Sequence, residues 1–312
     1  MQLSVVIPTF NRATVLERCL SALGAQSAPA STFEIIVVND GSADNTQQVV
    51  ERAADTLLSP VRYLRQANAG PAAARNRGLA LAHGDTVLFL GDDAIADRNL
   101  IQAHIEAQAA GPVACVGLIV PDEAHTLSPF ERFLEASGLQ FDYSPIHRDA
   151  NDLPFSMFYT ANVAAPRSAL VAVGGFDERF RDACWEDVEI GYRLARAGVR
   201  FRFAPKARVL HAHPMTLQQY MRRMEKAGCA ARLLVSLHPQ EEMASIVAPM
   251  LMSRLGYLLG GGRSHVAQIL ARVAETTGLA QRYPRLLYGS YAIALHYAFN
   301  RSFYGPAAAL EV

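Results

Sequence analysis

The sequence predicts an α/β protein built on a doubly wound, mostly parallel sheet flanked by helices, with a helical C-terminal appendage. Short apolar runs alternate with helical patterns through the first third of the chain. The first run, residues 3–7, is nearly continuous, which is typical of a parallel strand buried on both faces. From residue 243 onward the chain is apolar and helical, with no strand-like run.

The expected elements follow one another in a regular order. Apolar residues recur at helical spacing from residue 15, and Gly70-Pro71 opens an Ala-rich helix in which proline suits the first turn. Strands or strand-like segments are predicted at residues 3–7, 33–38, 61–64, 86–90, 113–120, 158–165 and 199–203. Helices are predicted near residues 15–23, 71–82, 97–105, 130–136, 167–173, 186–197 and 216–237. The rest of residues 121–155 is expected to form a long loop, often a binding loop or lid.

The length of 312 residues allows one large α/β domain and an appendage, so we expect domains at residues 1–214 and 215–312. The apolar stretches at residues 246–259 and 286–299 are shorter than the roughly 20 residues that span a bilayer. Two interpretations of the C-terminal region remain. Its helices pack together on the acceptor side or against a second copy, or they form a surface that lies on a membrane.

Composition excludes several classes of protein. The 29 Lys and Arg residues balance 29 Asp and Glu, whereas a nucleic-acid binder usually carries a basic excess. The cysteines form no Cys-x-x-Cys pair, so a thiolate zinc site and a disulfide framework are not expected. They are Cys19, Cys115, Cys184 and Cys229. The chain starts without a basic, apolar leader, so we expect no ordinary secretory signal and a cytoplasmic location, with the inner face of the membrane also open.

Polar clusters follow three of the predicted strands. These clusters are residues 8–12, residues 39–42 and residues 91–93. In a doubly wound sheet, ligands bind beyond the carboxyl ends of the strands, so the clusters are expected at one edge. Adjacent carboxylates such as Asp92 and Asp93 repel each other unless a cation compensates, and hard oxygen ligands suit Mg or Mn. The alternative is a solvated turn rich in aspartate.

Two further groups carry candidate chemistry. Glu186 and Asp187 lie at a predicted helix start, where one of them could take a proton from a hydroxyl, although the helix dipole alone explains acids there. His211 and His213 follow a strand-like segment, and each is either a metal ligand or a structural side chain. The chain has no G-x-G-x-x-G after the first strand and no Walker lysine loop, which argues against dinucleotide and P-loop enzymes.

These motifs, in this order, resemble glycosyltransferase family 2, whose members have the GT-A fold, use nucleotide-sugar donors and invert the anomeric carbon. The matching segments are residues 5–12, 37–46, 70–79, 89–93, 160–162, 174–178 and 186–189, with Arg193, Leu194 and Gly198. The resemblance covers roughly residues 2–213. One departure concerns Gly91, because many members have the first acid of Asp-x-Asp at that position.

The resemblance implies a role for each matching side chain. Asp187 would be the catalytic base, with Glu186 contacting the acceptor, and Asp93 and His211 would ligate Mn or Mg, with His213 as the rival histidine. Asp40 would contact the base, and Asp92 the ribose or the metal shell. The nucleotide-binding set is Pro8, Thr9, Asn11, Arg12, Asp40, Arg75 and Asp92. Arg75 would face the nucleotide or only support its loop. The acceptor side would include Asn162, Gly174 and Gly175.

The implied reaction is transfer of a sugar from a nucleoside diphosphate, with UDP favoured and GDP or dTDP open, to a saccharide or lipid-linked acceptor. Bacterial polysaccharide or glycolipid assembly in the cell envelope is the expected setting. The alternative is a donor-binding protein without transfer activity, which the Gly91 departure motivates. A nucleotidyltransferase would need a Gly-rich basic loop after the first strand, whereas this chain has Pro8-Thr9-Phe10-Asn11 there.

Overall fold

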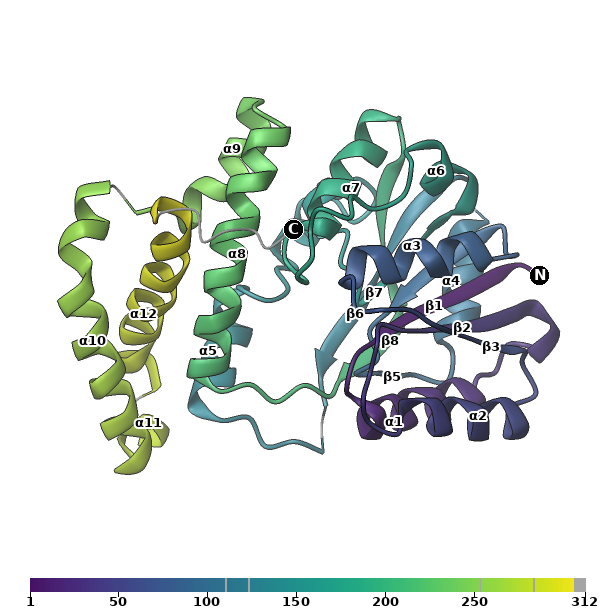
Figure 1. The fold of residues 1–312 in the computed structure, drawn as a ribbon, viewed down its shortest axis with the longest axis horizontal. Coiled ribbons are helices and arrows are strands. Elements are labelled where there is room, and N and C mark those ends of the chain that lie inside the picture. The colour runs from purple at the N-terminus through teal and green to yellow at the C-terminus, as the bar shows by residue number, and fades with distance from the viewer. Residues whose placement is uncertain (110, 123, 253, 283, 306–312) are drawn as a thin grey trace. The chain divides into compact units, whose positions relative to one another are not determined.

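The computed structural model describes the chain except for residues 110, 123, 253, 283 and 306–312. It contains the predicted sheet of mainly parallel strands flanked by helices, followed by C-terminal helices (Figure 1). The eight strands of the sheet lie in the order β3-β2-β1-β4-β7-β6-β8-β5. They are β1 Leu3–Thr9, β2 Phe33–Asn39, β3 Val61–Arg65, β4 Thr86–Leu90, β5 Ala94–Ala96, β6 Val113–Pro121, β7 Asn162–Pro166 and β8 Arg200–His211.

The pairing of strands brings the carboxyl ends of β1, β2 and β4 to one edge. β1 pairs in parallel with β2 and with β4, and β2 pairs in parallel with β3. β7 is antiparallel to both of its neighbours, and the short β5 is antiparallel to β8. The sheet is therefore mixed at one end, but the three strands that carry the predicted polar clusters all point the same way.

Helices cover both faces of the sheet because successive strand residues point to opposite sides. Val5, Val37 and Leu88 share a core with α1 (Ala13–Gly24), α2 (Thr46–Thr56) and α4 (Leu100–Gln108). Val6 points to the other side and packs against Gly78 of α3, where an added Cβ would overlap a Val6 methyl. The other α-helices that accompany the sheet are α3 Pro71–Leu81, α6 Arg167–Ala172 and α7 Glu186–Arg196.

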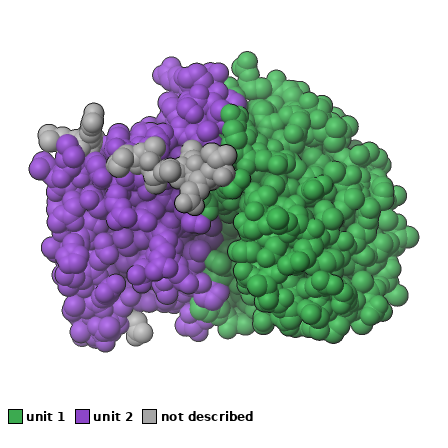
Figure 2. Space-filling view, in the orientation of Figure 1, with its two compact units in different colours: residues 1–125, 141–213 green, residues 126–140, 214–312 purple. Residues whose placement is uncertain are grey.

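The chain forms two compact units, which Figure 2 distinguishes by colour. The sheet unit comprises residues 1–125 and 141–213, and the helical unit comprises residues 126–140 and 214–312. Residues 126–140, which the sequence analysis placed in the first domain, thus group with the C-terminal helices. The reason is an aromatic cluster in which Phe130 contacts Tyr220 and Tyr291 edge to face.

In the helical unit, α12 contacts both α8 and α10 (Figure 1). Its helices are α5 Pro129–Ser137, α8 Leu217–Leu237, α9 Glu241–Val247, α10 Arg254–Thr276, α11 Leu279–Arg282 and α12 Pro284–Tyr304. The first helix of each chain segment begins with a complete capping box, from Ser128 with Glu131 and from Thr216 with Gln219. Within the described residues, none of the helices combines the length and the apolarity that crossing a bilayer requires.

Candidate functional site

Four predicted site residues meet at the carboxyl edge of β1 and β4. Arg12 contacts both acids, with Nη1 2.9 Å from Asp92 Oδ1 and Nη2 2.9 Å from Asp93 Oδ2. Thr9 donates its hydroxyl to Asp92 Oδ2 at 2.8 Å. Asp92 and Asp93 are both buried, whereas the Arg12 side chain is 29% exposed. The structure therefore compensates the paired carboxylates with a guanidinium that reaches solvent.

Strand pairing also brings the two histidines to Asp93. β5 follows Asp93 directly and pairs with β8 in a register that places Ala94 opposite His211. The Ala212 amide donates to the Asp93 carbonyl oxygen at 2.9 Å, which extends this pairing. As a result, His211 Nε2 lies 3.4 Å and His213 Nδ1 3.3 Å from Asp93 Oδ2. One carboxylate oxygen thus faces two imidazoles and the Arg12 guanidinium.

The pKa values of Asp92 and Asp93 are shifted in opposite directions. Burial, assisted by the charge of Asp93, raises the pKa of Asp92 to about 6, although Arg12 and the Thr9 hydroxyl oppose this shift. Burial also opposes ionisation of Asp93, but hydrogen bonds from His211 and His213 and the charge of Arg12 outweigh it, so the pKa of Asp93 lies well below its usual value. Asp93 is consequently the acid that stays ionised.

The donor chemistry around Asp93 fits a divalent cation. A carboxylate oxygen suits Mg and Mn, and imidazole nitrogens are ligands for divalent transition metals. Asp93 with His211 or His213 would be the ligands. In the described part of the chain, no group of three His, Cys, Asp or Glu side chains is arranged to hold a metal ion. Arg12 contacts the same Asp93 oxygen, so the guanidinium and a metal would compete for it.

Asp40 is buried and holds a loop. Its carboxylate accepts hydrogen bonds from the Ala69 amide at 2.9 Å, from the Gly70 amide at 2.9 Å and from Gln66 Nε2 at 2.7 Å. These contacts fix the segment that leads from β3 into α3. The predicted contact of Asp40 with a nucleotide base stays a prediction, and it would compete with these three donors.

Asn11 connects the loops that follow β1 and β2. Its backbone has a φ of +53°, which is uncommon for a residue with a side chain. The Asn11 side-chain oxygen accepts a hydrogen bond from the Ala43 backbone amide at 2.8 Å. The backbone N–H of Asn11 donates to Ser42 Oγ at 2.9 Å. Pro8 lies within β1 opposite Val38. These residues shape the edge on which Arg12 and Thr9 are presented.

Arg75 and Glu186 form a second, closed contact. Arg75 Nη1 lies 2.8 Å from Glu186 Oε1, and the two side chains are 9% and 3% exposed. The Arg75 guanidinium also lies over the Phe176 ring, 5.5 Å from its centroid. The two roles that the sequence left open for Arg75 stay predictions, and these contacts join Arg75 to the start of α7. They also place Glu186 in a buried ion pair, whereas the sequence predicted that it contacts the acceptor.

Asp187 is positioned differently from its neighbour. It lies in the first turn of α7, is only partly buried, and accepts a hydrogen bond from the Val188 amide at 2.8 Å. Trp185, the single tryptophan of the chain, precedes this turn with a φ of +71°. Since Arg75 belongs to α3, which begins where the Asp40-bound loop ends, the start of α7 lies at the same sheet edge as the polar clusters. Asp187 thus differs from the buried Glu186 in being partly exposed, and its role as the base stays a prediction.

The predicted acceptor-side residues have structural contacts. Asn162 is fully buried, donates to the Ala207 carbonyl at 2.8 Å and lies 2.8 Å from His104 Nε2. Burial lowers the pKa of His104 to about 4, with the Asn162 contact opposing, so the imidazole is neutral. Gly174 and Gly175 have φ values of +82° and +71° and form the turn after α6. Their proposed contacts with an acceptor stay predictions.

Sequence reasoning missed two features of this edge. Arg12 was assigned to the nucleotide, and its contacts with both acids depend on residues 80 and 81 positions away along the chain. Tyr159 was not singled out. Its pKa is raised by burial and by the nearby charges of Asp142 and Asp187, which places this phenol within electrostatic reach of Asp187. The available signal for Tyr159 was the strand-like segment predicted at residues 158–165, although the observed strand β7 begins only at Asn162.

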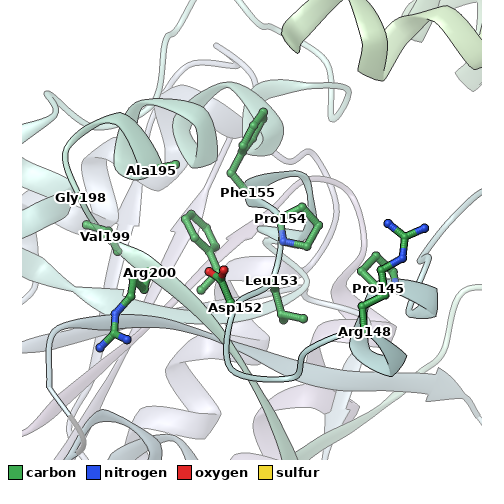
Figure 3. A pocket seen from close by; sticks show the side chains of 11 residues that line it. Pro145, Arg148, Asp152, Leu153, Pro154, Phe155, Ala195, Gly198, Val199 and Arg200 are labelled. Carbon is green, nitrogen blue, oxygen red and sulfur yellow. The ribbon is translucent and has the colours of Figure 1, made fainter.

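A separate cavity of about 570 Å³ lies at the other end of α7. Arg148, Asp152 and Phe155 line it together with the start of β8, including Arg200 (Figure 3). None of the predicted site residues belongs to its lining. The cavity is therefore distinct from the acidic edge.

Known proteins share this fold. The mannosyltransferase PcManGT from Pyrobaculum calidifontis, solved in complex with GDP-Man and Mn2+, aligns with a TM-score of 0.66 over 97% of this chain and 87% of that chain, at 18% identity. TarS from S. aureus, residues 1–349 in complex with UDP, aligns with a TM-score of 0.55 over 97% and 90% of the two chains, at 16% identity. The sheet and its flanking helices therefore have the GT-A fold of glycosyltransferases.

The sequence comparisons define the family. The sequence model described as glycosyl transferase family 2 matches residues 4–171, and the chain belongs to this family. Validoxylamine A glucosyltransferase of Streptomyces hygroscopicus subsp. jinggangensis is 35% identical over 227 residues, which cover 63% of this chain and 52% of that protein. Pre-mycofactocin glycosyltransferase of Mycobacterium tuberculosis is 30% identical over 88% of this chain and 56% of that protein. The chain thus spans about half the length of these curated relatives.

Proposed function

We propose that the chain is an inverting glycosyltransferase that moves a sugar from a nucleoside diphosphate to an acceptor hydroxyl. The observation that carries the proposal is the pairing of Glu186 with Arg75, which leaves Asp187 as the partly exposed carboxylate at the start of α7. Family membership and the GT-A fold support the same reaction class.

Each side chain at the edge has a proposed task. Asp187 takes the proton of the acceptor hydroxyl as the new bond forms at the anomeric carbon. The attacking and leaving groups lie on opposite sides of that carbon, so its configuration inverts. Thr9 orients Asp92 toward the donor, and Arg12 supplies positive charge beside the leaving diphosphate. A divalent ion, Mn or Mg, held by Asp93 and His211 or His213, would neutralise charge on that diphosphate.

The proposed donor is a UDP-sugar, and the proposed acceptor is a saccharide or a lipid-linked sugar. UDP is present in the structure of TarS, whereas the structure of PcManGT contains GDP-Man with Mn2+, so both bases have precedent among similar folds. Chondroitin synthase of Escherichia coli, 32% identical over 68% of this chain and 35% of that protein, is named for polysaccharide synthesis. We place the enzyme in the cytoplasm, in bacterial polysaccharide or glycolipid assembly.

The variant Asp187→Asn tests the proposed base. Transfer should fall by roughly 10²- to 10⁴-fold, because an amide cannot accept the proton, while donor binding is retained. Turnover is measured with sugar-nucleotide donors and saccharide acceptors, and binding by the shift in melting temperature that each nucleoside diphosphate causes with and without Mn²⁺. Asp55→Asn, at an exposed position of α2, is the matched control and should leave both unchanged.

Two outcomes would contradict the proposal. Near-normal turnover of Asp187→Asn would show that another group is the base. A nucleotide-dependent shift in the wild-type chain without transfer to any acceptor would instead support a donor-binding protein, the alternative suggested by Gly91.

A further inference from the structure

Helix α10 buries small residues and exposes large aliphatic ones, which is the reverse of an ordinary helix in a water-soluble protein. Its buried side consists of small residues, because Ser264, Ala267, Ala271 and Ala274 are each at most 9% exposed. The neighbouring α12 approaches this side so closely that a Cβ added to Gly260 would lie 3.3 Å from the Tyr297 ring. A surface helix normally turns its large apolar residues toward the protein. Among the described side chains of α10, those that face the interior are small.

The large aliphatic residues of α10 lie on its outer side. The following six are between 48% and 70% exposed: Leu258, Leu259, Val266, Ile269, Leu270 and Val273. At 100° per residue they fall within an arc of roughly 120° that runs along the helix. Contiguous exposed apolar surface of this kind is rare on soluble monomers and indicates a binding surface. We call these six residues the outer face of α10.

Basic residues flank the outer face. On the same helical projection, Arg263 lies at one margin of the aliphatic arc, and Arg272 with His265 lies at the other, all of them exposed. Residues 254–305 contain six arginines and one acid, Glu275, whereas the whole chain has a formal net charge of zero. Glu275 accepts a hydrogen bond from the Tyr291 hydroxyl at 2.6 Å. An apolar stripe between arginines is the pattern of a helix that lies in a membrane interface.

We propose that the outer face of α10 binds a membrane surface containing anionic lipid, with the aliphatic residues among the acyl chains and the arginines at the headgroups. Charge distinguishes this partner from a second copy of the chain. Two outer faces packed together would oppose arginines to arginines, with Glu275 as the single acid of the segment. Anionic headgroups complement the same arginines, and each arginine near such a surface strengthens binding about fivefold. This inference does not depend on the proposed sugar transfer.

Flotation of the full chain with lipid vesicles tests the proposal without donor or acceptor. Vesicles of phosphatidylcholine mixed with phosphatidylglycerol should bind the chain, and pure phosphatidylcholine should bind it much less. The double variant Ile269→Asp and Leu270→Asp should bind at least about 100-fold more weakly, because two buried aliphatic side chains become charged. Both positions are exposed, so the variant should retain the wild-type melting temperature.

Matched controls come from the sheet unit. Leu58→Asp with Val171→Asp changes two exposed aliphatic residues, 93% and 55% exposed, and should leave vesicle binding unchanged. Arg263→Gln with Arg272→Gln should weaken binding to the anionic vesicles roughly 30-fold. The corresponding change at the exposed Arg148 and Arg200 should have no such effect.

Three results would overturn the proposal. The chain would fail to float with anionic vesicles, or the Ile269→Asp and Leu270→Asp variant would float as well as the wild type. Alternatively, light scattering without lipid would show a dimer that this variant dissociates, which would identify a second copy as the partner of the outer face.

Discussion

Two arginine–carboxylate contacts in the sheet unit differ in charge balance and in exposure to solvent. Arg12 faces two acids, Asp92 and Asp93, and its side chain is 29% exposed. Arg75 faces the single acid Glu186, and its side chain is 9% exposed. The Arg12 group therefore carries an excess of negative charge and reaches solvent. The charges of Arg75 and Glu186 balance each other, and this pair is buried.

This difference assigns the two groups to different kinds of work. An acidic pair with one exchangeable arginine can accept a second cation, because like charges at close range favour any added positive charge. A buried one-to-one pair gains nothing from a ligand and is strongly destabilised by the loss of either partner. We infer that the Arg12 group is the binding site and that the Arg75 group fixes the start of α7.

The largest expected effect is at the closed pair. Arg75→Met should lower the free energy of unfolding by about 3–5 kcal/mol, because Glu186 is left buried without a partner. Among the residues that the structure describes, Glu186 Oε2 has no hydrogen-bond partner either. Chemical denaturation measures the change. The double variant Arg75→Met and Glu186→Met should recover much of the loss.

Arg52→Met supplies the control for this measurement. Arg52 pairs with Glu17 at 2.9 Å, but both side chains are more than half exposed, so the loss should stay below about 1 kcal/mol. Equal losses from Arg75→Met and Arg52→Met would contradict the distinction between a closed and an open contact.

A smaller effect is expected at the open group, together with rescue by metal. Arg12→Met should lower stability by about 1–2 kcal/mol in metal-free buffer, because two acids lose their shared cation. Added Mn²⁺ should raise the melting temperature of this variant more than that of the wild type, since Asp93 Oδ2 is released from the guanidinium. Differential scanning fluorimetry with and without Mn²⁺ records both.

The control is Arg18→Met, within α1, the helix that Arg12 directly precedes. Arg18 pairs with the single acid Asp122 at 2.7 Å. Mn²⁺ should not stabilise this variant beyond the wild type, and it should not rescue Arg75→Met. If Mn²⁺ shifted Arg12→Met no more than the wild type, Asp93 would not be the metal ligand.

The smallest expected effect is a pH dependence that belongs to Asp92. Burial raises the pKa of this carboxyl to about 6, so the folded state favours its protonated form. Its contribution to stability is complete below the ordinary value of 3.8 and is lost as the pH rises through about 6. Asp92→Asn removes this dependence and keeps an acceptor for Thr9. Between about pH 5 and about pH 7.5, the free energy of unfolding of the variant should rise by about 1 kcal/mol relative to that of the wild type.

Urea denaturation at both pH values, with a chelator present, checks this expectation. The stability difference between Asp92→Asn and the wild type could instead stay constant with pH. That result would mean that Asp92 is ionised throughout this range and would contradict the raised pKa.

Most of the fold was predictable because each buried strand carries a long apolar run. β1, β2 and β4 were placed within two residues at each end from their apolar runs alone. The sequence did not predict β5, because Ala94–Ala96 is too short to show a pattern, and it predicted too short a β8, because charged residues interrupt its outer half. Yet the pairing of these two strands is what brings His211 to Asp93.

The candidate site was predictable as a set of residues but not as a set of contacts. Asp92, Asp93, Glu186 and Asp187 stood out because acids at strand and helix ends are few and conspicuous. Their partners did not, since Arg12 and Asp93 are 81 residues apart and Arg75 and Glu186 are 111 residues apart. The alternation of apolar runs by itself indicated the sheet, its carboxyl edge and the acids found there. Only the tertiary structure decided which acid each arginine contacts, because charge compensation depends on distance in space and not on position along the chain.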